Sequence, residues 1–373
     1  MLTVLLADMD KCPFVFFKEY EASTATNLCK FRNFVMNIMA FAPYISLVCL
    51  LINLFHVIVL TQKSMRNSSI NLILAAVAIS DICFLLFPIQ LEVVAIQDSF
   101  QPCSTMNSYP VLLIKSIFDS IQFTSRRFSI WLSLSIAVIR TLVVRNPLDP
   151  KISQLSKPKS LGYCILCILP ICLPVSILGW LKYNLVLNPV QGFCAETNSP
   201  MIQYSSNYSD LFIANDYFVF RLYNFLESII SKLIPCILFP IFTFLLVKEL
   251  LKAEKSRAKM LNSGHSENSS GRKTKLVLYL TITFFIADFP LGIVIFLKLF
   301  FYPSSAITEV LNIFTFLFSF CLTVNTSTHM FICFYMSSQY RQTAKLILCC
   351  SCAPKRLMIP ETECSHKCGT DNK

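Results

Sequence analysis

The chain has 373 residues and a formal net charge of +11, with 55% hydrophobic and only 14% charged residues. Soluble domains carry about 25% charged residues, so this composition excludes a water-soluble protein. The positive charge does not indicate a nucleic-acid partner, because the basic residues lie mainly in alternate loops between apolar segments and in the tail. That distribution is typical of a membrane protein. We therefore expect the protein to lie in a lipid bilayer and to bind no nucleic acid.

Seven apolar segments are each long enough for a helix to cross about 30 Å of hydrocarbon. The third is the least apolar, since basic and acidic side chains interrupt it, but an even number of spans would break the alternation of charge between loops. The sequence therefore predicts an all-α membrane protein with a seven-helix bundle over residues 34–334. In chain order the spans are 34–60, 70–96, 111–144, 161–181, 222–247, 275–300 and 310–334.

Lys and Arg gather in the odd-numbered connections and in the tail, which predicts that these parts are cytoplasmic. Residues 1–33 then form an extracellular N-terminus, and 335–373 a cytoplasmic tail. We expect a multi-pass protein of the plasma membrane with this orientation. Asn207-Tyr-Ser lies in the fourth connection, on the expected outer face, and is a candidate glycosylation site, although such a triplet also arises by chance.

Segment 337–348, just after the last span, has the pattern of a short amphipathic helix. Tyr340, Ala344 and Ile347 fall on one side, so this helix is expected to lie on the inner leaflet. The cysteines that follow it are candidates for palmitoylation, or else are reduced cytosolic thiols. They are Cys349, Cys350 and Cys352.

Polar residues recur inside the spans, where each is costly and therefore a functional candidate. Their order resembles the rhodopsin-like (class A) G-protein-coupled receptors. The matching pieces are Asn53, Asn71 with Asp81, Arg140 with Pro147, Pro235, Asp288 with Pro290, and Asn325-Thr-Ser-Thr-His329. Two further motifs resemble the nematode serpentine receptor class W group and FMRFamide-type neuropeptide receptors. They are Ser125-Arg-Arg-Phe-Ser-Ile-Trp131 and Met336-Ser-Ser-Gln-Tyr-Arg341.

This resemblance implies a receptor that binds a peptide and activates a heterotrimeric G-protein. It assigns coupling and activation to Arg140, Pro147, Asn325 and His329. Arg140 departs from the family in its neighbours, because Ile139 and Ser270 stand where most members have acidic partners. Either the resting activity is raised, or Thr141 and the extension of the fifth span provide another restraint.

The resemblance also implies a ligand cavity and, beneath it, an internal sodium ion. Arg126 and Asp288 match positions that face each other, so we expect an ion pair, either a fixed bridge or a ligand-sensitive switch. Asp81, Ser129 and Asn325 match the sodium ligands, but the set is incomplete because Cys321 and Leu322 replace two others. The alternative is a hydrogen-bonded cluster without an ion, and we expect no other cofactor.

Three carboxylates match positions that line the upper cavity, namely Glu92, Asp119 and Glu227. They favour a cationic ligand, such as a peptide with Arg near its end, unless they pair with Lys115, Lys232 or Arg127. Gln122 is a further candidate ligand-binding residue, and it stands where amine receptors have an Asp, which disfavours an amine ligand.

Disulfide pairing stays open in the sequence. The family's usual cysteine in the third span is replaced by Lys115, so Cys103 is the nearest candidate to pair with Cys194, and Cys12 with Cys29 is a possible second bridge.

Other classes fit less well. A transporter often shows repeated halves with Gly-broken helices, and this chain has no visible repeat and only 7 glycines. The four histidines form no metal motif, so we expect no enzyme. An opsin needs a lysine in the seventh span, and 310–334 contains none. The alternative to a peptide receptor is a chemosensory receptor for an external small molecule.

Overall fold

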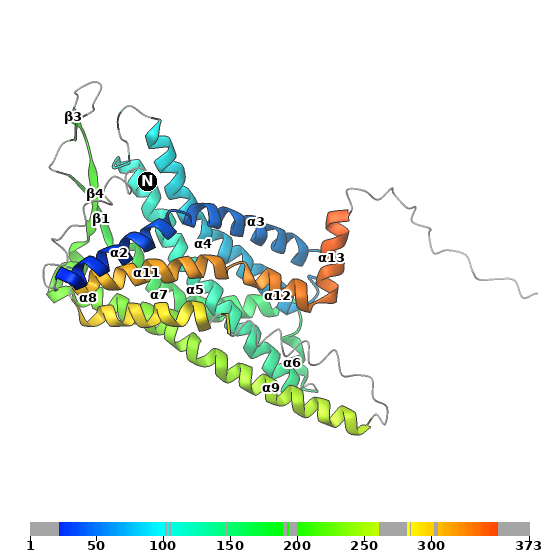
Figure 1. Cartoon of the computed structure of the whole chain (residues 1–373). Helices are drawn as coiled ribbons and strands as arrows, with labels where there is room; N and C mark the ends of the chain where they lie inside the picture. The colour runs from blue at the N-terminus through cyan, green and yellow to red at the C-terminus, as the bar shows by residue number, and fades with distance from the viewer. Residues whose placement is uncertain are drawn as a thin grey trace, which may run out of the picture.

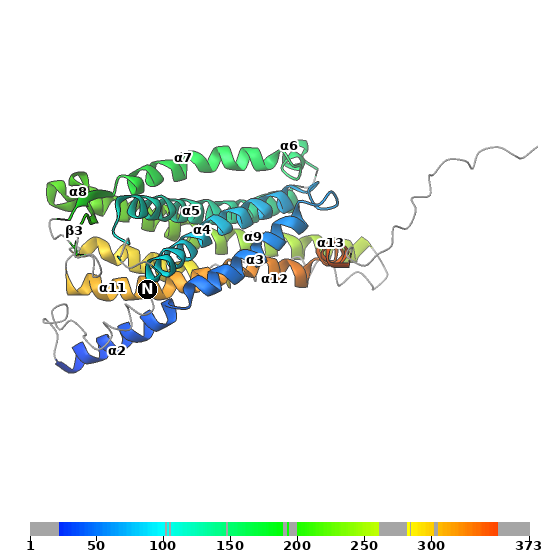
Figure 2. The same cartoon turned by 90° about the horizontal axis from the view of Figure 1, so that it is seen from above.

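The computed structural model describes residues 22–100, 103, 106–146, 148–188, 192–193, 200–260, 282–283, 285–301 and 305–349. Long helices lie side by side in one elongated bundle, and a short helix crosses one of its ends (Figures 1 and 2). The main helices are α2 (Ala22–Met39), α3 (Ala42–Leu60), α4 (Ser69–Ser99), α5 (Tyr109–Arg145), α7 (Ser160–Trp180), α8 (Asp210–Ser228), α9 (Ile234–Met260) and α11 (Ala306–Asn325). Shorter helices are α6 (Pro150–Gln154), α12 (Thr328–Met336) and α13 (Ser338–Cys349).

Six helices of the described residues are long and apolar enough to cross a membrane: Thr26–Leu60, Ser69–Ser99, Tyr109–Arg145, Ser160–Trp180, Asp210–Lys252 and Ala306–Tyr335. The predicted sixth span, 275–300, is helical over 285–297 and ends in the 3-10 turn Lys298–Phe300, while 275–281 and 284 lie outside the described residues. The predicted class, an all-α membrane bundle, is confirmed.

The side chains are sorted as a bilayer requires. Large apolar residues such as Leu51, Leu166 and Phe244 are exposed on the outside of the bundle. Polar residues are instead buried between helices, among them Asn53, Asp81 and Asp288, each 0% exposed. Because lipid offers no hydrogen-bond partners, helices satisfy their own backbone groups and turn polar side chains inward.

The first span differs from the prediction in its outer part. Helix α2 begins at Ala22 and runs through the expected boundary at residue 33, and Phe31 packs against Phe314 of α11 with ring centroids 5.4 Å apart. The helix is interrupted between α2 and α3, and Pro43 occupies the first turn of α3. Pro lacks a backbone N–H and is best accommodated at the start of a helix.

Strands in the fourth connection were not expected from the sequence. Strands β1 (Tyr183–Leu187) and β4 (Tyr204–Tyr208) pair antiparallel, with Asn184 opposite Asn207, and β2 (Gly192–Phe193) pairs with β3 (Pro200–Met201). The β1–β4 hairpin stands at one end of the bundle, next to the end of α7 and the start of α8 (Figure 1).

A π-helix, η1 (Ile229–Leu233), interrupts the fifth span between α8 and α9. The backbone N–H of Ile234 donates to the carbonyl of Ile229, five residues earlier. Pro235 follows and has no N–H to donate, so the regular helical bonding is already broken at this point. This widened turn sets the directions of the side chains before it.

The opposite end of the bundle is closed by α13, which lies across the helix ends (Figure 1). Tyr340 and Ala344 are buried against a core cluster that includes Leu60 and Ile73, and Ile347 packs beside them. The Tyr340 hydroxyl lies 2.8 Å from Nδ1 of His56 in α3. The predicted amphipathic helix, with these three residues on one side, is therefore confirmed.

Candidate functional site: a buried charge cluster beneath a polar pocket

Six charged side chains of the described residues are buried in the middle of the bundle. They are Asp81, Arg126, Arg127, Glu227, Lys232 and Asp288. An isolated charge in such a place costs several kcal/mol, so each needs a partner of opposite sign. The cluster joins α4, α5, α8, η1 and helix 285–297.

Asp288 binds two cations. Nη2 of Arg126 donates to Oδ2 of Asp288, so the predicted ion pair is present. Nζ of Lys232 lies 2.9 Å from Oδ1 of the same carboxylate. The sequence did not identify this second partner, which clamps helix 285–297 to both α5 and η1.

Arg127 and Glu227 form a second buried pair. Nη1 of Arg127 donates to Oε2 of Glu227, and the Ser231 hydroxyl donates to the same oxygen at 3.1 Å. Nη2 of Arg127 donates to the Ser176 hydroxyl at 2.9 Å. Of the alternatives left open for Glu227, the pairing with Arg127 is the one present, and Glu227 has little carboxylate surface left for a ligand.

A close approach of two helices brings Lys232 to Asp288. A Cβ atom added at Gly292 would lie 2.8 Å from the Cβ of Lys232, closer than real Cβ atoms come to any neighbour. Only glycine fits there, because the Cβ of Lys232 cannot rotate away.

We expect Gly292→Ala to push helix 285–297 away from η1 and to destabilise the protein by about 1–3 kcal/mol. The measurement is thermal melting of the purified full-length protein. Gly162→Ala is the matched control, since nothing lies within 4 Å of a Cβ there, and it should be neutral or stabilising. If the two variants have the same melting temperature, the close approach of the two helices does not contribute to stability.

The contacts of Asp81 show whether a sodium ion could bind beside it. The Ser129 hydroxyl donates to Oδ1 of Asp81 at 2.7 Å, and Nη1 of Arg126 lies 3.8 Å from that oxygen. The side-chain oxygen of Asn325 accepts a hydrogen bond from Thr328 at 3.1 Å. A hard cation needs several oxygen ligands. These residues supply a guanidinium in place of such ligands, so they do not fit the ion.

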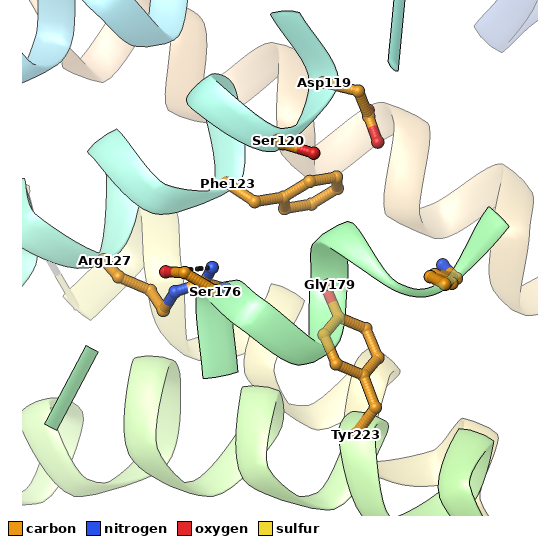
Figure 3. Close-up of a pocket in the computed structure, with 8 residues that line it drawn as sticks. Asp119, Ser120, Phe123, Arg127, Ser176, Gly179 and Tyr223 are labelled. Atoms are coloured by element: carbon orange, nitrogen blue, oxygen red, sulfur yellow. Dashed lines mark hydrogen bonds between the residues drawn. The ribbon is translucent and has the colours of Figure 1, made fainter. Parts of the chain in front are cut away.

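Above the charge cluster, toward the hairpin end, α5, α7 and α8 line a small, partly open pocket with a volume of about 10 Å³ (Figure 3). It is lined by Asp119, Ser120, Phe123, Arg127, Ser176, Gly179, Lys182 and Tyr223. Asp119, Ser120 and Phe123 project from α5 toward α7, and Tyr223 reaches in from α8 (Figure 3). The pocket thus combines one carboxylate, two hydroxyl-bearing serines and two aromatic rings.

The two cations of the pocket already have other contacts. Arg127 is paired with Glu227, as described above. The ammonium of Lys182 lies over the rings of Tyr183, Tyr208 and Tyr223, at 4.8, 5.8 and 5.5 Å from their centroids. Burial raises the pKa of the Tyr208 hydroxyl, so this ring remains neutral. Asp119 forms no hydrogen bond and no ion pair within 4 Å among the described residues, but the ammonium groups of Lys182 and Lys115 interact with its carboxylate over a longer distance.

Sequence reasoning missed Lys182, Ser176 and Tyr223 as pocket residues. Their positions are set by the end of α7 and by the hairpin, which the sequence did not predict. The one signal in the sequence that could have indicated an aromatic site is the group of tyrosines within residues 183–223. Of the other predicted ligand residues, Glu92 accepts a hydrogen bond from Tyr44 at 3.3 Å and Gln122 is half-buried on α5. Neither lines this pocket.

Arg140 lies at the other end of α5, 21 residues or about 31 Å from Asp119 along the helix. Within the described part of the chain it forms no ion pair. Its neighbour Thr141 donates to the carbonyl of Phe242 in α9 at 3.2 Å. Phe242 lies inside the predicted fifth span 222–247 and not in the extension considered from the sequence. His329 lies in α12 with Nδ1 buried and lacking a described partner, and Pro147 lies outside the described residues.

The candidate modification sites are only partly described. Cys29 and Cys103 are both disulfide-bonded, while the candidate partners Cys12 and Cys194 lie outside the described residues. Asn207 is exposed on β4. Cys349 ends α13, and Cys350 and Cys352 lie beyond the part of the chain that is described.

The bundle has a polar pocket near one end. Near the other end lies Arg140, which forms no ion pair with the described residues. This arrangement is typical of a transmembrane receptor. Residues 40–351 match the family model described as "Serpentine type 7TM GPCR chemoreceptor Srw". The chain belongs to this family, so the resemblance found in the sequence is confirmed and the protein is a receptor rather than an enzyme.

The chain is also similar to a protein described as G-protein coupled receptor dmsr-1, from Caenorhabditis elegans. The two are 26% identical over 219 residues, which is 57% of this chain and 42% of that relative. The matched part therefore spans less than half of the relative's length.

Proposed function

We propose that this protein is a plasma-membrane receptor for a neuropeptide of the FMRFamide type, and that it activates a heterotrimeric G-protein when the peptide binds. The N-terminus and the hairpin end face outward, and the C-terminus and α13 face the cytosol. Family membership and the distribution of basic residues support this orientation.

The observation that best supports the proposal is the position of the Asp119 carboxylate in the pocket. It lines the pocket beside Phe123 and Tyr223 and has no direct ion-pair partner among the described residues, since Arg127 is paired with Glu227 and Lys182 acts on it only over a longer distance. A carboxylate without an ionic partner attracts a cation, and aromatic faces bind a guanidinium or a ligand ring. A peptide with an arginine close to an aromatic residue satisfies both requirements.

Asp119→Asn tests this assignment. A hydrogen bond between charged groups contributes about 1.5–3 kcal/mol, so the half-maximal concentration of an Arg-containing amidated peptide should rise about 10- to 100-fold. The measurement is second-messenger output in cells that express the receptor with promiscuous G-proteins, normalised to surface expression. Asp210→Asn is the control, because Asp210 is an exposed acid at the same end of the bundle.

A second comparison isolates the contact. Replacing the peptide's arginine by citrulline should weaken its action on the wild type, and should cause little further loss on Asp119→Asn. An equal loss on both receptors would show that Asp119 does not contact that arginine.

The alternative is a chemosensory receptor for an external small molecule, which the family's description as chemoreceptors favours. The same cells distinguish the two functions. A response confined to small soluble or volatile compounds, with none to amidated peptides, would favour the alternative. A membrane transporter was the least favoured alternative in the sequence, and family membership argues against it.

A further inference from the structure

Four of the buried charges form one connected group around Arg126. Its guanidinium lies between two carboxylates, with Nη2 donating to Asp288 and Nη1 3.8 Å from Oδ1 of Asp81. Lys232 approaches Asp288 from the other side, with Nζ at 2.9 Å. All four side chains are at most 7% exposed.

The charges of this group balance without any bound ion. In their ionised forms, Asp81 and Asp288 contribute two negative charges, and Arg126 and Lys232 contribute two positive ones. The neighbouring Arg127–Glu227 pair is balanced as well. A further cation would leave a net positive charge in a region of low dielectric constant, which is unfavourable.

The geometry around Asp81 leads to the same result. Oδ1 already accepts the Ser129 hydroxyl and faces the guanidinium, and Oδ2 has no hydrogen-bond partner among the described residues. One remaining oxygen is too few for a hard cation. The apolar side chain of Leu322 supplies no oxygen, and the side-chain oxygen of Asn325 accepts from Thr328.

We propose that Arg126 is a tethered internal cation which occupies the place that the family resemblance gives to a sodium ion. The stability of this receptor is therefore independent of sodium. The positive charge beside Asp81 is part of the chain, so it cannot be exchanged with the surrounding salt.

Removing this cation should create a sodium site. In Arg126→Gln the group has one uncompensated negative charge, and the shorter side chain leaves space next to Asp81. The double variant Arg126→Gln/Asp81→Asn is the matched control, because it is neutral again and keeps the Lys232–Asp288 pair. The control should lack any response to sodium.

The test is thermal melting of the purified full-length protein in NaCl, KCl and N-methyl-D-glucamine chloride at equal ionic strength. We expect the wild type and the double variant to melt at the same temperature in all three salts. Arg126→Gln should melt higher in NaCl than in the other two, by about 2–4 °C.

Two results would overturn the proposal: sodium-specific stabilisation of the wild type, or no sodium response in folded Arg126→Gln. If Arg126→Gln cannot be purified, the wild-type comparison decides alone, with equal melting supporting the tethered cation. None of these measurements needs an agonist, so they remain valid if the proposed peptide function is wrong.

Discussion

Asp288→Asn should remove most of the receptor from the cell surface and abolish most of its peptide response. The substitution turns the carboxylate that contacts both Arg126 and Lys232 into a neutral amide, so only the Asp81 carboxylate, 3.8 Å from Arg126, is left to balance the two buried cations. Loss of one partner from a buried ion pair costs about 3–5 kcal/mol, a large share of the stability of a typical protein. Surface expression by flow cytometry and melting of the purified protein measure the effect.

The control for this substitution is Asp216→Asn. Asp216 forms an ion pair with Arg221 at 3.5 Å, but its side chain is 66% exposed. Its backbone has a φ of 54°, which asparagine adopts readily. Exposed pairs contribute about 1 kcal/mol or less, so this variant should behave as the wild type. Normal surface expression and peptide response of Asp288→Asn would refute the proposed importance of the buried pair.

Glu227→Gln should also be strongly destabilising, by about 3–5 kcal/mol, because it leaves the guanidinium of Arg127 buried without a counter-charge. The side chains of Arg127 and Glu227 are only 2% and 7% exposed, so water cannot compensate the charge. Hydroxyl groups of Ser176 and Thr124 would remain near the guanidinium, but they carry no charge. The melting temperature of the purified protein measures the loss.

The double variant Arg127→Gln/Glu227→Gln shows whether the loss is electrostatic. Removing both charges of a buried pair costs far less than removing one, so the double variant should recover most of the melting temperature. If it is no more stable than Glu227→Gln, the role of Glu227 is to fill space and not to balance charge.

The spans and the Arg126–Asp288 pair could be predicted because each depends on one strong physical requirement. A helix must be long and apolar to cross lipid, and a buried arginine needs a negative partner. Six of the predicted spans overlap helices that are long and apolar enough to cross a membrane, and Arg126 is paired with Asp288. Nothing in the sequence required Asp288 to bind Lys232 as well, and that second contact was missed.

Lys232 was considered only as a partner of the upper carboxylates, and its contact with Asp288 was missed because the sequence does not show the π-helix. On a regular helix, residues 227 and 232 point about 140° apart, since successive side chains turn by about 100°. Their simultaneous inward direction depends on η1, whose five-residue bonding ends at Ile234. The outer part of α2 was missed for a different reason. Asn27, Lys30 and Arg32 make it too polar to be recognised as part of a span, and it is held by contacts such as Phe31 with Phe314.

The widened turn at 229–233 also affects how this helix is compared with its relatives. A π-helix holds more residues in a turn than the regular helix that continues on either side. In a relative whose fifth span is regular, the structural equivalent of Glu227 is therefore one residue nearer to the proline than its counterpart here. A sequence alignment anchored on Pro235 therefore needs a one-residue gap inside 229–233. Without that gap, each residue of this span before the π-helix is aligned one position away from its structural equivalent.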